Sequence, residues 1–325
     1  MKVSSVEQQI KNFALTEARM DKVGIADISR FNESPEGMHP TDFLPGCKSV
    51  IAFCTRLPDG AVEACFRSFE DGNQSVHGTY GAHGYGGTPN FNLMWANYKI
   101  SRFVEKITGE VAMPNTAGPT HGAKMMSMRH CAYAAGLGEF GWSSLMLTPE
   151  FGPRNRFGAV LTTAELRPDP MYDGPRLCDP SVCHVCEKMC PTGAIPPYEE
   201  RMGRIVDCGG KEVSYSLINW AKCRLMCHGT RAEYNASGED IVPREETDPL
   251  NEDLDVIGKF FTGDNTIKNF HQHNPTWKCG NCLTYCPVGN WRERFYDTGL
   301  SHIDTDRFID GKTAVALQEG CEVAQ

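Results

Sequence analysis

The chain has 325 residues, a formal net charge of −9 and fifteen cysteines, and 40% of its residues are hydrophobic. This length and composition predict one large or two ordinary globular domains with a sizeable buried core. The acidic balance and the absence of a lysine and arginine run argue against nucleic-acid binding. Neither a signal peptide nor an apolar stretch of about eighteen residues is visible, so we expect a cytoplasmic protein without a membrane span.

The first part of the chain alternates helix and strand patterns. Residues 5–20 carry apolar side chains at helical spacing, and the strand-like runs 23–28 and 49–53 follow. A second helical pattern over residues 100–107 precedes a short strand-like run at 111–113. The alternation predicts an α/β (α+β) core.

Two irregular stretches interrupt this pattern. Residues 76–92 interleave glycines with aromatic side chains, which is typical of a mobile surface loop or of a loop that closes over a flat cofactor or substrate. Residues 228–275 are acidic and long for a connection, which indicates either a solvated insertion or a lid or partner-docking surface.

The cysteines are concentrated in one region, because ten of them lie between Cys178 and Cys286. The cytoplasm keeps thiols reduced, so metal ligation is a better interpretation than disulfides. Isolated thiols are usually small buried apolar residues. We expect this of the four that are scattered through the first half of the chain: Cys47, Cys54, Cys65 and Cys131.

Two cysteine motifs carry the strongest signal, LCDPSVCHVCEKMCPTGAI at 177–195 and CGNCLTYCP at 279–287. In two-cluster ferredoxins, three ligands of a 4Fe-4S cluster come from a tight run, and the cysteine before proline crosses to the other cluster. Crossing assigns four cysteines to one cluster: Cys178, Cys183, Cys186 and Cys286. The other cluster receives three, and needs an eighth cysteine: Cys190, Cys279 and Cys282.

The candidates for this eighth ligand are Cys208, Cys223 and Cys227. Residues 203–220 resemble a hairpin about a Gly-Gly turn, which would leave Cys208 at the tip, pointing away. We therefore predict Cys223, directly after the hairpin, with Cys227 as the alternative.

The first interval is unusual, because four residues separate Cys178 from Cys183. The same interval occurs in plant-type 2Fe-2S proteins, but the Cys-Pro ending and the second motif favour two 4Fe-4S clusters. A zinc site needs fewer ligands and leaves the Cys-Pro pairs unexplained. Two clusters would relay single electrons to the first part of the chain or to a partner protein.

The string GLGEFG at 136–141 matches the dinucleotide-binding pattern G-x-G-x-x-G. However, RHCAYAA before it resembles a helix where a strand is required, and no strand ending in an acid follows about twenty residues later. We therefore do not predict a dinucleotide site.

The wider stretch HCAYAAGLGEFGWSSLMLTPEFGPRNRFGAVLTTAEL, followed by the cysteine run, resembles the cobalamin-dependent reductive dehalogenases. VGIADI followed by LPGCKSVIAF resembles the epoxyqueuosine reductases, a related cobalamin and iron-sulfur family. The similarity covers most of the chain apart from residues 76–92 and 228–275.

This resemblance implies a nitroreductase-like core at 1–170 that holds cobalamin, with FMN as the alternative. It implies a bacterial ferredoxin-like two-cluster module at 171–227 and 276–300. The acidic insertion at 228–275 and a tail at 301–325 complete the expected organisation.

The resemblance also implies cofactor contacts. Glycines would let the backbone approach a corrin ring: Gly136, Gly138 and Gly141. Hydrogen bonds to its amide arms and phosphate would come from three polar side chains: Thr148, Arg154 and Arg156. Simple surface solvation is the alternative for the two arginines.

The proton donors of both families are missing at their matched positions. The tyrosine of the dehalogenases corresponds to the stretch Thr108, Gly109, Glu110, and the aspartate of the epoxyqueuosine reductases corresponds to a place near Gly122. Five nearby residues could protonate a substrate: His121 first, then Lys124 and Glu110, and also Arg129 and His130, for which orienting the backbone is the alternative.

These features predict a reductase that cleaves a carbon-halogen or C–O bond of a small organic substrate, with electrons from an external donor such as ferredoxin or flavodoxin. The alternatives are an epoxyqueuosine-reductase-like enzyme and a non-catalytic protein for electron transfer or corrinoid handling.

Overall fold

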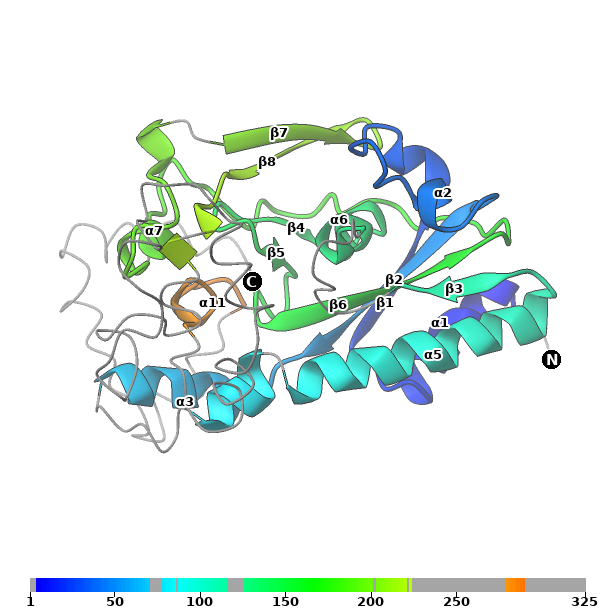
Figure 1. Cartoon of the computed structure of the whole chain (residues 1–325), viewed down its shortest axis with the longest axis horizontal. Helices are drawn as coiled ribbons and strands as arrows, with labels where there is room; N and C mark the ends of the chain where they lie inside the picture. The colour runs from blue at the N-terminus through cyan, green and yellow to red at the C-terminus, as the bar shows by residue number, and fades with distance from the viewer. Residues whose placement is uncertain are drawn as a thin grey trace, which may run out of the picture.

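The computed structural model describes residues 4–70, 78–85, 87–115, 126–200, 203–220, 222–223 and 279–289. Its centre is a four-stranded antiparallel sheet with the order β1-β2-β6-β3 (Figure 1). The strands are β1 (Lys22–Asp27), β2 (Ser49–Arg56), β3 (Ala112–Pro114) and β6 (Asn155–Thr162). The predicted strands at 23–28, 49–53 and 111–113 are therefore confirmed.

The sheet is covered on both faces because successive side chains of a strand point to opposite sides. On one face, Ile51 and Phe53 of β2 pack with apolar residues of α1 (Val6–Thr16) and α5 (Thr88–Thr108). On the other face, Val50 and Ala52 pack with α6 (Met128–Ala134). Figure 1 shows α5 below the sheet and α6 above it. The predicted mixed α/β class is confirmed.

The two predicted helices of the first part are confirmed, and their ends have local causes. The Ser5 side chain accepts a hydrogen bond from Gln8 N and caps the start of α1. Gly109, with φ of 75°, ends α5 and donates to Glu105 O. Only glycine takes this left-handed conformation without strain, which explains why the helix stops here.

The predicted hairpin at 203–220 consists of β7 (Gly203–Cys208) and β8 (Lys211–Ser216), joined by Gly209 and Gly210. It lies on the α6 side of the molecule (Figure 1). Cys208 is buried at its end, where its Sγ donates to Arg30 O at 3.3 Å. The scattered cysteines are buried, as expected: Cys47, Cys54, Cys65 and Cys131.

The helix-like RHCAYAA segment is indeed helical, since it lies in α6 and a small hairpin follows it. This hairpin pairs β4 (Glu139–Phe140) with β5 (Met146–Leu147). No long strand precedes the GLGEFG string in this part of the described chain, which agrees with the rejection of a dinucleotide site.

Short helices surround the cysteine motifs at one end of the sheet. They are α3 (Asp59–Glu70), the π-helical turn η2 (Tyr80–Tyr85), α7 (Val185–Lys188), the 3-10 turn η3 (Tyr198–Glu200) and α11 (Asn281–Thr284). Two others, η1 (Ile28–Phe31) and α2 (Pro40–Phe43), lie between β1 and β2. An apolar cluster that includes Leu57, Val62, Val185 and Leu283 packs both motifs against the end of β2.

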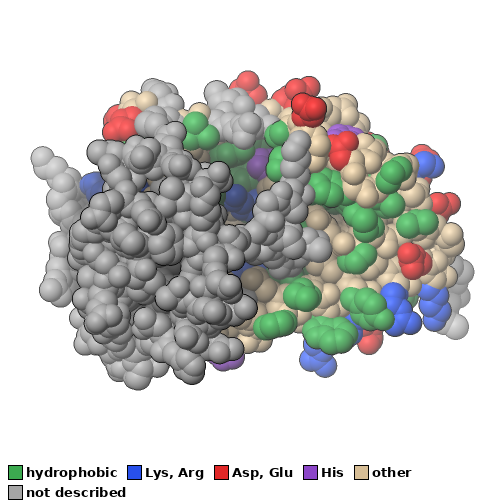
Figure 2. Space-filling view, in the orientation of Figure 1, with side chains coloured by type: hydrophobic (Ala, Val, Ile, Leu, Met, Phe, Trp, Pro, Cys, Tyr) green, Lys and Arg blue, Asp and Glu red, His purple; other side chains and the backbone are tan. Residues whose placement is uncertain are grey.

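One face of α5 carries exposed apolar side chains. Phe91, Met94, Trp95 and Tyr98 recur at helical spacing and are between 50% and 64% exposed. Figure 2 shows hydrophobic side chains along the edge of the molecule formed by α5, beside lysine and arginine side chains. Within the described residues, no helix has both the length and the apolar character needed to cross a membrane.

Candidate functional site

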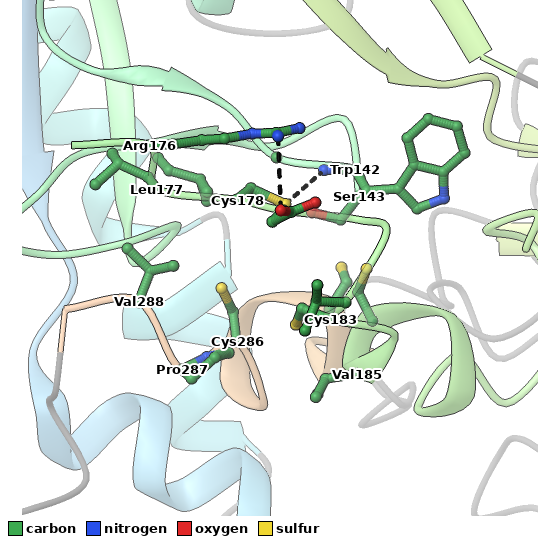
Figure 3. Close-up of a pocket in the computed structure, with 16 residues that line it drawn as sticks. Trp142, Ser143, Arg176, Leu177, Cys178, Cys183, Val185, Cys286, Pro287 and Val288 are labelled. Atoms are coloured by element: carbon green, nitrogen blue, oxygen red, sulfur yellow. Dashed lines mark hydrogen bonds and ion pairs between the residues drawn. The ribbon is translucent and has the colours of Figure 1, made fainter. Parts of the chain in front are cut away.

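Cysteines from both motifs line one cavity of about 310 Å³, which we call the cysteine cavity. Figure 3 shows Cys178, Cys183 and Cys286 around it, although Cys286 lies about a hundred residues later in the chain. The cysteines that line it are Cys178, Cys183, Cys186, Cys282 and Cys286. The fold thus brings together all four thiols that the crossing pattern predicts for one cluster, together with Cys282, which the pattern assigns to the other.

The chemistry of this donor set fits an iron-sulfur cluster. A 4Fe-4S cluster takes four thiolates, and metal binding displaces the thiol protons. Burial, with a smaller contribution from the nearby Cys286, raises the pKa of Cys178 to about 12 and that of Cys183 to about 11. The free thiols are therefore protonated near neutral pH, and only a bound cation would stabilise them together as anions.

Arg154 docks the second cysteine motif on the core. It extends from the loop before β6, is 2% exposed, and donates to Leu283 O at 3.3 Å, to Cys286 O at 2.9 Å and to Val288 O. The expected contact to a cofactor phosphate is replaced by these bonds to backbone carbonyls, because the guanidinium is enclosed by residues 283–288.

Arg154→Met is expected to destabilise the chain by at least about 3 kcal/mol, since it leaves several buried carbonyls without their charged donor. Anaerobic urea unfolding measures this loss, and the iron content should fall as well. Arg102→Met is the matched control, because the Arg102 side chain is exposed on α5, where it donates to Tyr98 Oη at 3.4 Å, and does not line the cysteine cavity. Equal stability of the two variants would contradict the docking role.

The first motif is held by the segment that follows α6. Glu139 accepts hydrogen bonds from Cys178 N at 3.0 Å and from Leu177 N. Trp142 N donates to Cys178 Sγ at 3.3 Å. The two motifs are also tied to each other, because Asn281 Nδ2 donates to Met189 O at 2.9 Å. The sequence analysis missed Glu139, although it stands directly after the glycines of AGLGE.

A chain of hydrogen bonds connects Cys223 with Cys190. Ala194 N donates to Cys190 Sγ at 3.1 Å, Asn219 N donates to Ala194 O at 2.9 Å, and Cys223 N donates to Asn219 O at 3.0 Å. Cys208 lies elsewhere, against Arg30. This geometry favours Cys223 over Cys208 as the eighth ligand, and Cys227 lies outside the described residues.

Cys223→Ser is expected to remove the signal of one cluster in electron paramagnetic resonance (EPR) spectra of the reduced protein, whereas Cys208→Ser keeps both signals. The reason is that Cys223 follows the segment bonded to Cys190, while the Cys208 thiol is enclosed by the core. Loss of a cluster in Cys208→Ser alone would move the eighth ligand to Cys208.

The predicted cofactor-binding glycines are required for packing within the chain. A Cβ on Gly136, which has a φ of 79°, would lie 2.1 Å from Pro170 O, and one on Gly138 would lie 1.8 Å from Leu147 O. Gly141 differs, because it lines the cysteine cavity. Packing within the chain therefore explains why glycine is required at positions 136 and 138, without any contact to a corrin ring.

Thr148 and Arg156 are also engaged inside the chain. Thr148 is fully buried, and its hydroxyl accepts from Phe151 N and from Asn155 Nδ2, both at 3.2 Å. Arg156 Nε donates to Tyr85 O at 2.8 Å. Neither residue lines the cysteine cavity or the second cavity described next.

A second cavity of about 530 Å³ lies between residues 30–38, α6 and the end of β8. The His130 ring bridges two hydroxyls in it, with Nδ1 2.7 Å from Ser127 Oγ and Nε2 3.1 Å from Tyr215 Oη. The Tyr215 ring stacks on Phe140 at 4.8 Å. The sequence left His130 either as a proton donor or as a residue that orients the backbone, and the structure places it beside a tyrosine hydroxyl in a cavity. The sequence analysis did not identify Tyr215.

The two cavities share a wall formed by residues 142–144. Trp142 and Ser143 line the cysteine cavity, and Ser144 lines the second cavity. Arg129, whose pKa is lowered by burial, donates to Ser144 O, and Ser216 N donates to Trp142 O at 3.1 Å. A group in the second cavity is therefore separated from the thiols by one short stretch of chain.

Of the other predicted proton donors, Glu110 is described by the structure, and it does not join this site. Glu110 follows the far end of α5, whose 21 residues span about 30 Å, and its carboxylate accepts from Thr163 Oγ1 at 2.7 Å. It lines neither cavity. His121 and Lys124 lie outside the described residues.

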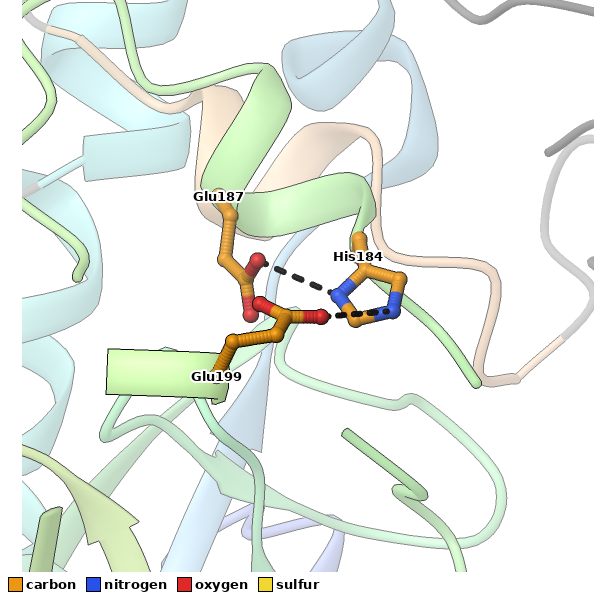
Figure 4. Close-up of side chains that lie close together, drawn as sticks. All are labelled: His184, Glu187 and Glu199. Atoms are coloured by element: carbon orange, nitrogen blue, oxygen red, sulfur yellow. Dashed lines mark hydrogen bonds and ion pairs between the residues drawn. The ribbon is translucent and has the colours of Figure 1, made fainter. Parts of the chain in front are cut away.

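A separate group of charged residues lies beside the first motif. His184 Nδ1 is 3.2 Å from Glu187 Oε2, and His184 Nε2 is 3.7 Å from Glu199 Oε1 (Figure 4). The ligand atoms lie within 4.8 Å of one another, as a metal site requires. Since each ring nitrogen already faces a carboxylate, the group is better explained as a polar link between α7 and η3.

Comparisons with known proteins identify relatives of this chain, although no family model matches it. A tetrachloroethene reductive dehalogenase of Desulfitobacterium hafniense is 35% identical over 149 residues, which are 45% of this chain and 25% of that protein. The enzyme of the same name from Dehalobacter restrictus is 39% identical over 162 residues, 44% of this chain and 28% of that protein. The predicted resemblance to the reductive dehalogenase superfamily is confirmed.

The chain spans about a quarter of the length of these curated relatives. A solved epoxyqueuosine reductase, in complex with a modified tRNA-Tyr stem loop, matches 87% of this chain and 66% of its own with a TM-score of 0.50 and 15% identity. At this identity the match demonstrates a shared fold alone. By their names, these relatives are oxidoreductases.

Proposed function

We propose that the chain is an iron-sulfur reductase of this superfamily that cleaves a carbon-halogen bond of a small organic substrate. The main support is the shared wall at residues 142–144, with converging thiols on one side and the hydrogen-bonded pair His130 and Tyr215 on the other. Two 4Fe-4S clusters, when bound, supply single electrons. Two electrons and one proton replace the halogen with hydrogen and release a halide ion.

In this proposal, each polar residue of the second cavity has a distinct role. Tyr215 provides the proton at its hydroxyl, and His130, oriented by Ser127, restores that proton. Arg129 places positive charge at the wall, where the leaving halide develops negative charge. Apolar side chains such as Phe31 and Trp220 line the rest and suit a hydrophobic substrate.

The identity of the cofactor rests on the resemblance, which implies cobalamin, with FMN as the alternative. Thr148, Arg154 and Arg156 have their hydrogen-bonding groups engaged within the chain and do not fit the predicted contacts to cobalamin. We therefore derive no step through that cofactor. The nitroreductase-like core, the two-cluster module and an external ferredoxin or flavodoxin donor belong to the same proposal.

An epoxyqueuosine-reductase-like reaction is the second candidate, and the fold match to an RNA-bound member favours it. The net charge of −9 weighs against RNA as the substrate. A non-catalytic role in electron transfer or corrinoid handling is the third.

Anaerobic purification followed by iron analysis and optical spectroscopy tests the proposal. We expect about eight irons per chain, a corrinoid or flavin spectrum, and release of chloride from tetrachloroethene or a related halide. About four irons would contradict the two-cluster assignment. Binding of a tRNA stem loop without halide release would favour the second candidate, and reducible clusters without any turnover would favour the third.

A further inference from the structure

Tyr80 is a buried residue in a surface turn that the proposed reaction does not use. It begins η2 and is 1% exposed, although Thr79 and His83 around it are exposed. Its ring packs over Gly84, where a Cβ would lie 2.4 Å from Tyr80 Cδ2. The Tyr80 side chain therefore points into the interior of the protein.

The Tyr80 hydroxyl reaches the second cysteine motif. A Cβ on Gly280 would lie 1.9 Å from Tyr80 Oη and 2.4 Å from Cζ, so position 280 has room only for glycine. Gly280 stands between Cys279 and Cys282, two predicted ligands of one cluster. The phenol group thus lies against the backbone that presents these two thiols.

The turn that carries Tyr80 is fixed to the central sheet. Arg156 of β6 donates from Nε to Tyr85 O at 2.8 Å, and its guanidinium lies 5.6 Å from the centre of the Tyr85 ring. Tyr80 also packs with Ala64 and Cys65 of α3. The described part of the glycine-rich stretch is therefore a packed wall beside the second motif.

We propose that Tyr80 is a positioning residue for the cluster held by Cys279 and Cys282, where its ring excludes water and its hydroxyl stabilises negative charge on the cluster. This inference rests on the proposed two-cluster function. Hydrogen bonds to the sulfur atoms and solvent exposure set the reduction potential of such clusters.

Tyr80→Phe tests this role, because it removes the hydroxyl and keeps the ring. In an anaerobic redox titration followed by EPR, we expect the midpoint potential of one cluster to become more negative and that of the other to stay unchanged. The iron content should match that of the unmodified protein. Tyr85→Phe is the matched control on the same turn, and both of its potentials should stay unchanged.

Two unchanged potentials in Tyr80→Phe would overturn the inference. An equal shift of the midpoint potential in Tyr85→Phe would also overturn it, because the effect would then not be specific to the Tyr80 hydroxyl. Loss of about four irons from Tyr80→Phe would overturn it as well, because the hydroxyl would then be needed to retain the cluster and not to set its potential. A failure of the two-cluster assignment is recognised separately, since the unmodified protein would then lack one or both clusters, and a failure of the proposed reaction is recognised by the absence of halide release from unmodified protein that holds both.

Discussion

Tyr215→Phe is expected to lower turnover by about 10²- to 10⁴-fold, the range lost when a general acid is removed. The substitution deletes the hydroxyl that lies 3.1 Å from His130 Nε2 and keeps the ring that stacks on Phe140. Halide release from a reactive organohalide measures the effect. Iron content and cluster spectra should not change, because Tyr215 lies outside the cysteine cavity.

Tyr133→Phe serves as the control for this experiment. Tyr133 is also a buried tyrosine near Phe140, at a ring distance of 5.9 Å, but it does not line the second cavity. We expect its turnover to stay near that of the unmodified protein. Full activity of Tyr215→Phe combined with an inactive His121→Phe would contradict the assignment and return the donor to His121, the first candidate from the sequence.

Cys286→Ala is expected to remove the same EPR signal as Cys178→Ala and about half of the iron. The crossing pattern assigns Cys286 to the cluster of the first motif. Cys286 lines the cysteine cavity with the thiols of that motif, although Cys282 of the second motif lines it too. Cys279→Ala should remove the other signal. Because each variant deletes one thiolate and leaves the backbone unchanged, the pairing of lost signals reports directly on which ligands belong together.

A different pairing of lost EPR signals among these three cysteine variants would contradict the assignment. If Cys286→Ala and Cys279→Ala removed one signal and Cys178→Ala removed the other, each motif would ligate its own cluster. Such a result would refute the crossed arrangement. Leu57→Ala provides a control for destabilisation of the same apolar cluster without loss of a ligand, and both signals should persist in it.

The sequence predicted the features that depend on neighbouring residues. The buried strands, α1, α5 and the hairpin of β7 and β8 follow from hydrophobic spacing and glycine turns. The grouping of Cys178, Cys183 and Cys186 with Cys286 was predicted from motif spacing and stays a prediction, since the cavity that these four thiols line also contains Cys282.

The polar contacts of the site depend on tertiary structure and were not predictable. His130 and Tyr215 are 85 residues apart, and they meet only because β8 packs over α6. Arg154 binds carbonyls about 130 residues later in the chain. No spacing rule connects such pairs. At Gly138 the need for glycine was recognised, but the atom that requires it, Leu147 O, was not.

The most direct test of the proposed reductive cleavage of a carbon-halogen bond is a single-turnover experiment with protein whose clusters have been reduced. Excess reductant is removed, tetrachloroethene is added anaerobically, and cluster EPR signals and chloride are measured together. We predict that the signals disappear as chloride appears, and that Tyr215→Phe slows both changes. Signals that persist in the presence of organohalides, with no halide released, would contradict a reductive dehalogenase-like function.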